Sequence, residues 1–233
     1  MKSVAILRFS RTEGPAYFAH WLDGRGISWK LIAVDEGAPV PADPNAFAGI
    51  GMMGGPMSVN DALPWVDPVC AFLRNAVAAD VPVIGHCLGG QLLAKALGAK
   101  VARAPIAEIG WVDVEVAEPA RDEWFGGRAA FPTFQWHYEG FELPAGARHV
   151  LGNRFNANQG YVIDDRHLGL QCHVEMTRDL VDTWLASGGS ELPQVSEAAI
   201  QSAADIRRNL DARIASLNAV AGDIYARWAQ GLG

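Results

Sequence analysis

The chain has few cysteines and no long apolar segment, and both shortages exclude whole classes of protein. Its three cysteines, Cys70, Cys87 and Cys172, follow neither a disulfide nor a metal-binding spacing. No run approaches the roughly 20 apolar residues of a membrane helix, and the apolar stretch at residues 1–8 is too short for a signal peptide. We therefore expect a protein of a reducing compartment, the cytoplasm, with no part in the membrane.

Positive charge is also scarce. Lysine and arginine together number 19, against 26 aspartate and glutamate residues, which gives a formal net charge of -7. Nucleic acids and anionic membranes would repel such an average surface, so we expect neither as a partner. No internal repeat and no P-loop is visible. Hydrophobic residues make up 50% of the chain, which is enough to fill the core of one domain of ordinary size.

Short apolar segments alternate with helical patterns in the first hundred residues. Residues 3–9, 28–34 and 47–53 are expected to be strands, and residues 14–23 and 65–79 are expected to be helices. Strands that are apolar throughout are typical of a parallel sheet covered by helices on both faces. Ligands of such sheets bind beyond the carboxyl ends of the strands.

The pattern changes after residue 110. Residues 111–116 alternate apolar and charged side chains, and further short runs between residues 131 and 173 are separated by turn residues. Residues 196–228 carry apolar side chains at steps of three and four, which predicts a long amphipathic helix that Gly222 bends or breaks. The expected fold class is α/β, with a mainly parallel central sheet, helices on both faces, a partly antiparallel extension and a C-terminal helical extension.

The sequence around Cys87 predicts a nucleophile. An apolar run over residues 81–94 breaks at this cysteine, within the pattern Gly-x-Cys-x-Gly, and then continues as a helix. A tight turn of this kind between a strand and a helix is the thiol version of a nucleophile elbow. The N-terminus of a helix also favours the thiolate, which is the reactive form. A buried core cysteine is the alternative that this segment alone leaves open.

A base and an orienting group follow far downstream, in residues 168–175. In extended backbone, residues two apart point to the same side, so His173 and Glu175 should project together. Glu175 can then accept a hydrogen bond from one imidazole nitrogen while the other nitrogen faces Cys87. A His-x-Glu pair by itself is more often a surface feature, but together with the elbow it predicts a catalytic triad.

Three separated motifs resemble the class I, triad-type glutamine amidotransferases. Residues 85–91, Gly-His-Cys-Leu-Gly-Gly-Gln, are similar to the family pattern around the nucleophile. Residues 171–175, Gln-Cys-His-Val-Glu, are similar to the pattern that carries its histidine and glutamate. Residues 54–59, Gly-Gly-Pro-Met-Ser-Val, resemble the Gly-Gly-Pro loop that completes the oxyanion hole.

The departures from the family pattern lie outside the triad. His86 stands where Val or Ile is usual, and Cys172 and Val174 stand where Phe and Pro are common. The resemblance divides the chain into an amidotransferase-like domain at 1–190 and a helical extension at 191–233. We expect the extension to pack on the same domain or on the partner in a homodimer, and a docking arm for a synthetase is the less favoured alternative.

The resemblance also implies the roles of further residues. It implies that the backbone N–H groups of Leu88 and Gly55 stabilise the oxyanion, and that Gln91 helps to hold the substrate. The alternative for Gln91 is a solvated helix residue. No metal and no cofactor is implied.

Residues 134–141 resemble the segment of the family whose backbone meets the α-amino and α-carboxylate groups of the substrate. The resemblance therefore implies that Tyr138 and Glu139 lie near these groups. His137 is at least as well explained as a structural histidine of the loop as by a catalytic role.

The reaction implied by the resemblance is hydrolysis of the γ-amide of L-glutamine through a γ-glutamyl thioester on Cys87. The ammonia released would be used by a synthetase or other acceptor on a separate chain. Two alternatives remain open. One is a γ-glutamyl peptidase or hydrolase that acts on larger γ-glutamyl amides, and the other is a non-catalytic regulatory or binding protein that retains the fold. The intact Cys87, His173 and Glu175 favour an enzyme.

Overall fold

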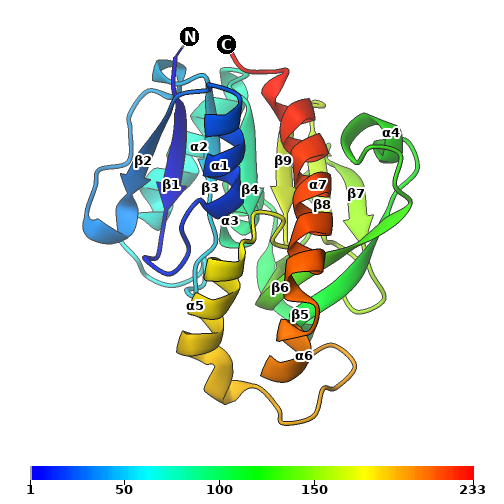
Figure 1. The fold of residues 1–233 in the computed structure, drawn as a ribbon. Helices are drawn as coiled ribbons and strands as arrows, with labels where there is room; N and C mark the ends of the chain where they lie inside the picture. The colour runs from blue at the N-terminus through cyan, green and yellow to red at the C-terminus, as the bar shows by residue number, and fades with distance from the viewer. Residues whose placement is uncertain (1) are drawn as a thin grey trace.

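The computed structural model describes residues 2–233, which contain one mixed sheet (Figure 1). Its strand order is β2-β1-β3-β4-β9-β8-β7-β5-β6; neighbours from β2 to β9 pair in parallel, and the remaining neighbours pair antiparallel. The strands are β1 (Val4–Arg8), β2 (Trp29–Ala33), β3 (Gly49–Met52), β4 (Val83–His86), β5 (Val101–Val116), β6 (Ala130–Phe141), β7 (Arg148–Gly152), β8 (Gly160–Ile163) and β9 (His167–Leu170).

Helices cover both faces of the sheet, with α1, α5 and α7 in front of it and α2 and α3 behind it in Figure 1. The α-helices are α1 (Ala16–Gly24), α2 (Val66–Ala78), α3 (Leu88–Ala96), α4 (Ala120–Trp124), α5 (Arg178–Gly188), α6 (Ala203–Arg207) and α7 (Leu210–Ala229). Short 3-10 helices are η1 (Val34–Glu36), η2 (Pro44–Ala46) and η3 (Gly189–Glu191). The α/β fold expected from the sequence is confirmed.

The sheet separates two hydrophobic cores, and the central strands serve both. Along β1, Val4 and Ile6 belong to the core under α1 and α7, while Ala5 and Leu7 belong to the core under α2 and α3. Successive side chains of a strand point to opposite faces, so a strand between two helical layers must be apolar at every position. This explains why the first strands of the chain have continuous apolar sequences.

The long helix expected over residues 196–228 is divided in the structure. Ser202 caps α6 by accepting a hydrogen bond from the backbone of Asp205, and α7 begins only after Asn209. Asn209 has a φ of 55°, a left-handed conformation that interrupts the helix. Gly222 lies within α7, which continues through it for a total of 20 residues.

α7 packs on α1 and on the sheet through aromatic side chains. The ring centroid of Phe18 lies 4.8 Å from that of Tyr225 and 5.6 Å from that of Trp228. The Tyr225 hydroxyl also lies 3.1 Å from Nε2 of His86, while Nδ1 of His86 lies 3.1 Å from the Met52 carbonyl oxygen. Because this carbonyl can only accept, Nδ1 donates to it and Nε2 accepts from Tyr225. The C-terminal helix therefore reaches the residue that precedes Cys87.

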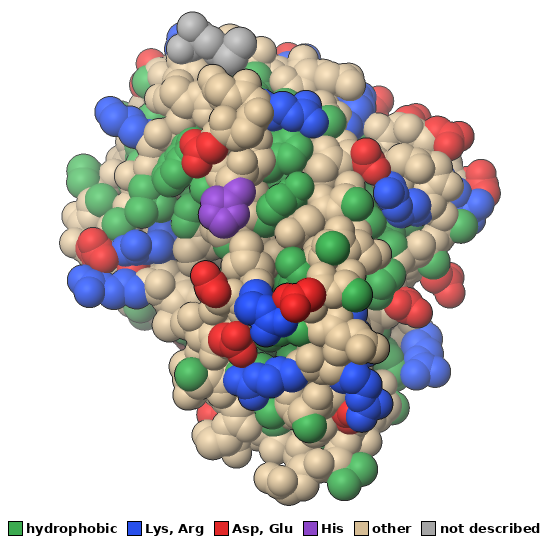
Figure 2. Space-filling model, in the orientation of Figure 1, with side chains coloured by type: hydrophobic (Ala, Val, Ile, Leu, Met, Phe, Trp, Pro, Cys, Tyr) green, Lys and Arg blue, Asp and Glu red, His purple; other side chains and the backbone are tan. Residues whose placement is uncertain are grey.

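Charged side chains gather over the lower half of the face that carries α5 and α6 (Figure 2). Two ion pairs on this side join α5 to the C-terminal helices, Arg178 to Asp211 at 2.6 Å and Arg207 to Asp182 at 3.3 Å. Solvent screens exposed pairs of this kind, so they stabilise the protein much less than a buried aromatic side chain does. Apolar packing therefore holds the C-terminal helices in place. No helix within residues 2–233 has the length and apolar character needed to cross a membrane.

Replacing Trp228 by alanine should lower the free energy of unfolding by about 3–5 kcal/mol, because its side chain is 1% exposed and the cavity left behind would not collapse fully. Urea denaturation would measure the change. Ser216→Ala, at an exposed position of the same helix, is the matched control and should stay within about 0.5 kcal/mol of the original protein. A loss for Trp228→Ala as small as that of the control would show that α7 is not part of the core.

Candidate active site

Cys87 lies at a sharp turn between β4 and α3, as the Gly-x-Cys-x-Gly pattern predicts. Its backbone has a φ of 49° and a ψ of -107°, which is unfavourable for any residue other than glycine. Two backbone hydrogen bonds hold this conformation: Cys87 donates to Leu170 at 2.8 Å, and Gln91 donates to the Cys87 carbonyl at 2.9 Å. The strained turn is thus fixed by β9 on one side and by α3 on the other.

Glycines allow α3 to lie directly against the sheet. A Cβ atom on Gly85 would overlap the backbone of Gly89, and one on Gly90 would overlap the carbonyl oxygen of Leu170. Any larger residue at these positions would push the helix away from β4 and β9. The glycines around Cys87 therefore set the distance between the elbow and the strand that leads to the histidine.

His173 and Glu175 follow β9 in the chain and form a buried pair. The His173 backbone N–H donates to the Phe134 carbonyl at 2.9 Å, and its Nδ1 lies 2.6 Å from Glu175 Oε1. The two side chains are 1% and 2% exposed. Trp184 packs edge-on against the imidazole, with 4.7 Å between ring centroids. Because a carboxylate can only accept, Nδ1 carries the proton in this bond, and Nε2 remains for another partner.

The electrostatics of this pair favour an imidazolium beside a carboxylate. Burial alone would lower the pKa of His173, but the charges of Glu175 and Cys87 outweigh it and hold this pKa well above its usual value. Burial alone would raise the pKa of Glu175, and the neighbouring His173 outweighs it and keeps this pKa below its usual value. The structure thus brings together all three residues of the predicted triad.

Gln91 lies inside the protein, so the alternative of a solvated helix residue is wrong. It is 4% exposed, and its side-chain nitrogen donates to Gln171 Oε1 at 3.1 Å and to the Glu139 carbonyl at 3.3 Å. Gln171 in turn donates to Cys87 Sγ at 3.5 Å. The sequence analysis gave Gln171 no role, although it stands in the motif that carries His173.

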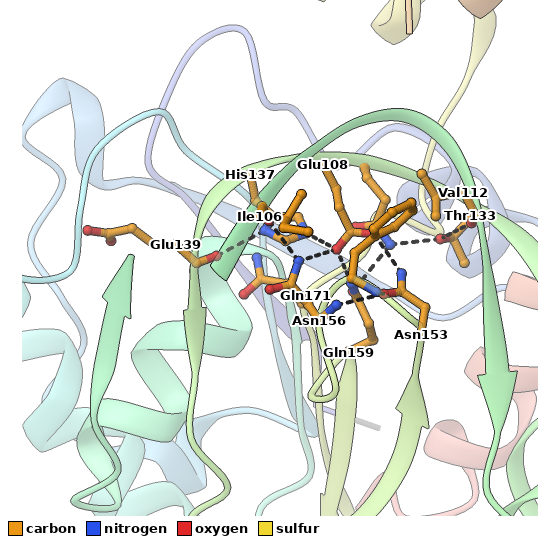
Figure 3. A network of polar contacts seen from close by, with 12 residues as sticks. Ile106, Glu108, Val112, Thr133, His137, Glu139, Asn153, Asn156, Gln159 and Gln171 are labelled. Carbon is orange, nitrogen blue, oxygen red and sulfur yellow. Dashed lines mark hydrogen bonds and ion pairs between the residues drawn. The ribbon is translucent and has the colours of Figure 1, made fainter. Parts of the chain in front are cut away.

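A buried carboxylate, Glu108, organises a polar network beside this chain of contacts (Figure 3). The side-chain amides of Asn153, Asn156 and Gln159 donate to it at 2.6, 2.5 and 2.6 Å. His137 Nε2 lies 3.3 Å from Glu108 Oε2 without hydrogen-bond geometry. Burial alone would raise the pKa of Glu108, but these neighbours outweigh it and lower the pKa. The carboxylate is therefore kept charged inside the protein.

The network fixes the backbone of the segment that the sequence analysis linked to the substrate. Nδ1 of His137 lies 3.0 Å from the Glu139 carbonyl and donates to it. The same carbonyl accepts from Gln91, so two buried side chains hold one peptide group of β6. His137 therefore has the contacts of a structural histidine in the described chain, which was one of its two interpretations.

A cavity of about 630 Å³ opens above Cys87. Of the predicted oxyanion and substrate-binding residues, Gly55, Gln91 and Tyr138 line this cavity. Leu88 does not, because its side chain is buried at the start of α3. The volume falls in the range of about 300–1,000 Å³ that is typical of small-molecule sites. Residues 2–233 show no group of three or more His, Cys, Asp or Glu side chains arranged to hold a metal ion.

One wall of the cavity carries opposite charges. Arg103 of β5 and Glu139 of β6 are direct cross-strand partners, and both line the cavity. The hydroxyl of Ser58 donates to Glu139 Oε2 at 2.8 Å, which orients that carboxylate. The sequence analysis did not single out Arg103, because its partner lies on another strand.

Glu13, which the sequence analysis also missed, lies beside the imidazole of His173. It belongs to the loop after β1 and lines the cavity. A Cβ atom on Gly54 would overlap Glu13 Oε2 and would stand 2.8 Å from His173 Cε1. Oε2 is buried and makes no hydrogen bond within the described chain. Burial raises the pKa of Glu13 to about 7, although the charge of His173 acts in the opposite direction. The signal available in the sequence was its position just beyond the carboxyl end of a strand.

Glu13→Gln should stabilise the protein above neutral pH. The pKa of Glu13 is about 7 in the folded state against 4.5 for the ordinary group, so between these values unfolding releases a proton and the free energy of unfolding falls as the pH rises. The neutral amide avoids this cost and should raise that free energy by roughly 1–3 kcal/mol at pH 8, with a smaller gain at pH 5. Denaturation at both pH values would measure the difference, with exposed Glu142→Gln as the control. An equal gain at both pH values would contradict the raised pKa.

Comparison with known proteins agrees with this architecture. The sequence matches the family described as glutamine amidotransferase class-I over residues 18–186, which is well over half of the chain. The protein therefore belongs to the class I glutamine amidotransferases, as the three motifs predict.

Individual relatives cover most of the chain. A crystal structure of a glutamine amido transferase from Methylobacillus flagellatus is 46% identical, covers 100% of this chain and 96% of its own, and superposes with a TM-score of 0.97. The glutamine amidotransferase-like protein YfeJ of Salmonella typhimurium is 28% identical over 84% of this chain and 85% of its own length. Gamma-glutamyl peptidase 4 of Arabidopsis thaliana is 28% identical over 73% of this chain and 72% of its own length.

Proposed function

We propose that this protein hydrolyses the γ-amide of L-glutamine through a covalent thioester on Cys87. The observation that carries the proposal is the buried His173–Glu175 pair beside a cysteine held at a strained elbow. Glu175 occupies Nδ1 of the imidazole, which leaves Nε2 as the base and acid for the sulfur and the leaving group. Membership of the class I glutamine amidotransferases supports the same class of reaction.

In the first step, the Cys87 thiolate attacks the γ-carbonyl carbon, and the carbonyl oxygen takes up the negative charge. The backbone N–H groups of Leu88 and Gly55 are the proposed donors to this oxyanion. The C–N bond then breaks, and its electron pair takes the proton from His173, so that ammonia leaves and the thioester remains. Water, activated by the same imidazole, releases glutamate and restores the thiolate.

The charged wall of the cavity suits the other end of the substrate. Glutamine carries an α-carboxylate and an α-ammonium group close together, and Arg103 and Glu139 present the complementary charges from neighbouring strands. Gln91 and Tyr138 line the same cavity and are proposed to complete this binding site. Binding of the α-groups would place the γ-carbonyl over Cys87.

The released ammonia needs an acceptor. We propose that a synthetase on a separate chain carries this acceptor and consumes the ammonia. For residues 191–233 we propose a role as part of the same domain, supported by the packing of α7 on α1 and the sheet. A homodimer remains the alternative arrangement for this extension.

A γ-glutamyl peptidase is the second candidate function. The cavity has more room than a free amino acid needs, and Trp136 and Trp184 form part of its walls. The similarity to gamma-glutamyl peptidase 4 points in the same direction. In this case the same triad would act on a γ-glutamyl amide with a larger leaving group.

Cys87→Ala should abolish both glutamine hydrolysis and covalent labelling by glutamine-mimicking electrophiles, because the thioester needs this sulfur. Cys70→Ala and Cys172→Ala are the controls and should retain both. Burial raises the pKa of each of these two thiols, so neither forms a reactive thiolate. Mass spectrometry would locate the label. Labelling that persists without Cys87 would refute the nucleophile, and a complete lack of labelling and turnover in the original protein would favour the non-catalytic alternative.

L-asparagine should be hydrolysed at least about 100-fold less efficiently than L-glutamine, as judged by kcat/KM. Its side chain is one methylene shorter, and a displacement of about 1 Å between the carbonyl and the thiolate can cost a factor of that size. Steady-state release of ammonia would measure both reactions. Comparable kcat/KM values would show that the α-groups do not position the substrate as proposed.

A further inference from the structure

The triad leaves one acidic group at the cavity without a function, the half-buried Glu13. Its Oε2 atom is buried beside His173 and makes no hydrogen bond within the described chain. An unpaired carboxylate at such a place costs stability, as its pKa of about 7 indicates. Groups of this kind persist at functional sites, where a ligand supplies the missing partner.

The position of Glu13 relates it to the leaving group. In the proposed hydrolysis, His173 gives its proton to the departing nitrogen, so this nitrogen must lie against the imidazole. Glu13 adjoins the same imidazole across Gly54 and lines the same cavity. The leaving amine therefore departs next to the Glu13 carboxylate, which can accept a hydrogen bond from its N–H group.

Charge on the cavity walls restricts which amine can occupy this place. Within the described chain, Arg103 is the one lining residue with a permanent positive charge, and it stands opposite Glu139 on the wall formed by β5 and β6. Glu13 comes from a different wall, the loop after β1. Trp184 lines the cavity near His173 and could contact a cation through its ring face. His173 loses its positive charge when it gives its proton to the leaving nitrogen, so the remaining surroundings of this nitrogen favour positive over negative charge.

We propose that Glu13 forms a leaving-group subsite that accepts ammonia or a cationic amine and disfavours an amine that carries a carboxylate. The proposal rests on the γ-glutamyl hydrolase activity described above and deepens it. Under this proposal, the substrates are glutamine and γ-glutamyl conjugates of diamines. γ-Glutamyl dipeptides are disfavoured, because their leaving amino acids carry a carboxylate.

Three synthetic amides whose leaving groups have nearly the same shape would test the subsite. The γ-glutamyl amides of propylamine, 1,2-diaminoethane and β-alanine carry a methyl, an ammonium and a carboxylate group after the same two methylenes. The measurement is kcat/KM for each amide, with L-glutamine as the reference. The original protein should prefer the cationic amide to the anionic one by about 10- to 100-fold, the range that one charge-assisted hydrogen bond supplies.

Variants of Glu13 test whether this residue causes the preference for the cationic amide. Glu13→Gln should reduce the cation-to-anion ratio to about threefold or less, whereas Glu13→Asp, which keeps the charge, should retain more of it. The cation-to-anion ratio is the readout, because any loss of the N–H contact to Glu13 affects all three amides, including the neutral propylamide, and cancels in this ratio. Glu142→Gln removes the same charge from an exposed position outside the cavity and should keep the original ratio, which excludes an effect of net charge alone.

The outcomes separate this subsite from the activity on which it rests. Three results would overturn the subsite if glutamine is still hydrolysed: no preference between the charged amides, a preference for the anionic amide, or no turnover of any substituted amide. Each of these results would leave the proposed glutaminase activity intact. A ratio that is unchanged in Glu13→Gln would also overturn it. Failure of every γ-glutamyl compound to react at Cys87 would overturn both proposals.

Discussion

The parallel pairing of β4 with β9 is the contact on which the site depends. It places Ile84 beside Leu168 and His86 beside Leu170, so two strands far apart in the chain end together at the same edge. Cys87 follows one strand and His173 follows the other. Because glycines let α3 lie against these strands, the sulfur and the imidazole approach each other without any flexible loop between them. A shift of this register would separate Cys87 from His173, the proposed nucleophile and base.

Two carboxylates, Glu108 in the interior and Glu13 at the cavity, have opposite environments. Glu108 receives three amide hydrogen bonds and contacts His137, so it is charged and fully satisfied. Glu13 has no such partners. A satisfied buried carboxylate makes a local structure rigid, and an unsatisfied one destabilises the free protein until a ligand arrives. Glu108 therefore contributes to the shape of the cavity, whereas Glu13 is proposed to contact the ligand bound in it.

The sequence was informative where the chemistry is local. The elbow around Cys87 and the His-x-Glu segment each carry their geometry within a few residues, so the sharp turn at Cys87 and the contact between His173 and Glu175 could be predicted, as could the fold class. Glu108 and Glu13 could not, since their neighbours come from distant segments; Glu108 meets Asn156 across 48 positions of the chain. The break in the helical segment 196–228 was expected at Gly222 and lies at Asn209, because apolar spacing does not report the left-handed backbone of Asn209.

The hydrogen bond between Tyr225 and His86 joins the last helix of the chain to the base of the elbow. Burial lowers the pKa of His86, so its neutral ring needs both of its partners to remain satisfied. Detachment of α7 would leave Nε2 of that ring unpaired and expose the apolar face of the sheet that α7 covers. The C-terminal helix and the turn at Cys87 therefore belong to one cooperative opening unit, in which slow amide exchange at α7 and at this turn would be lost together.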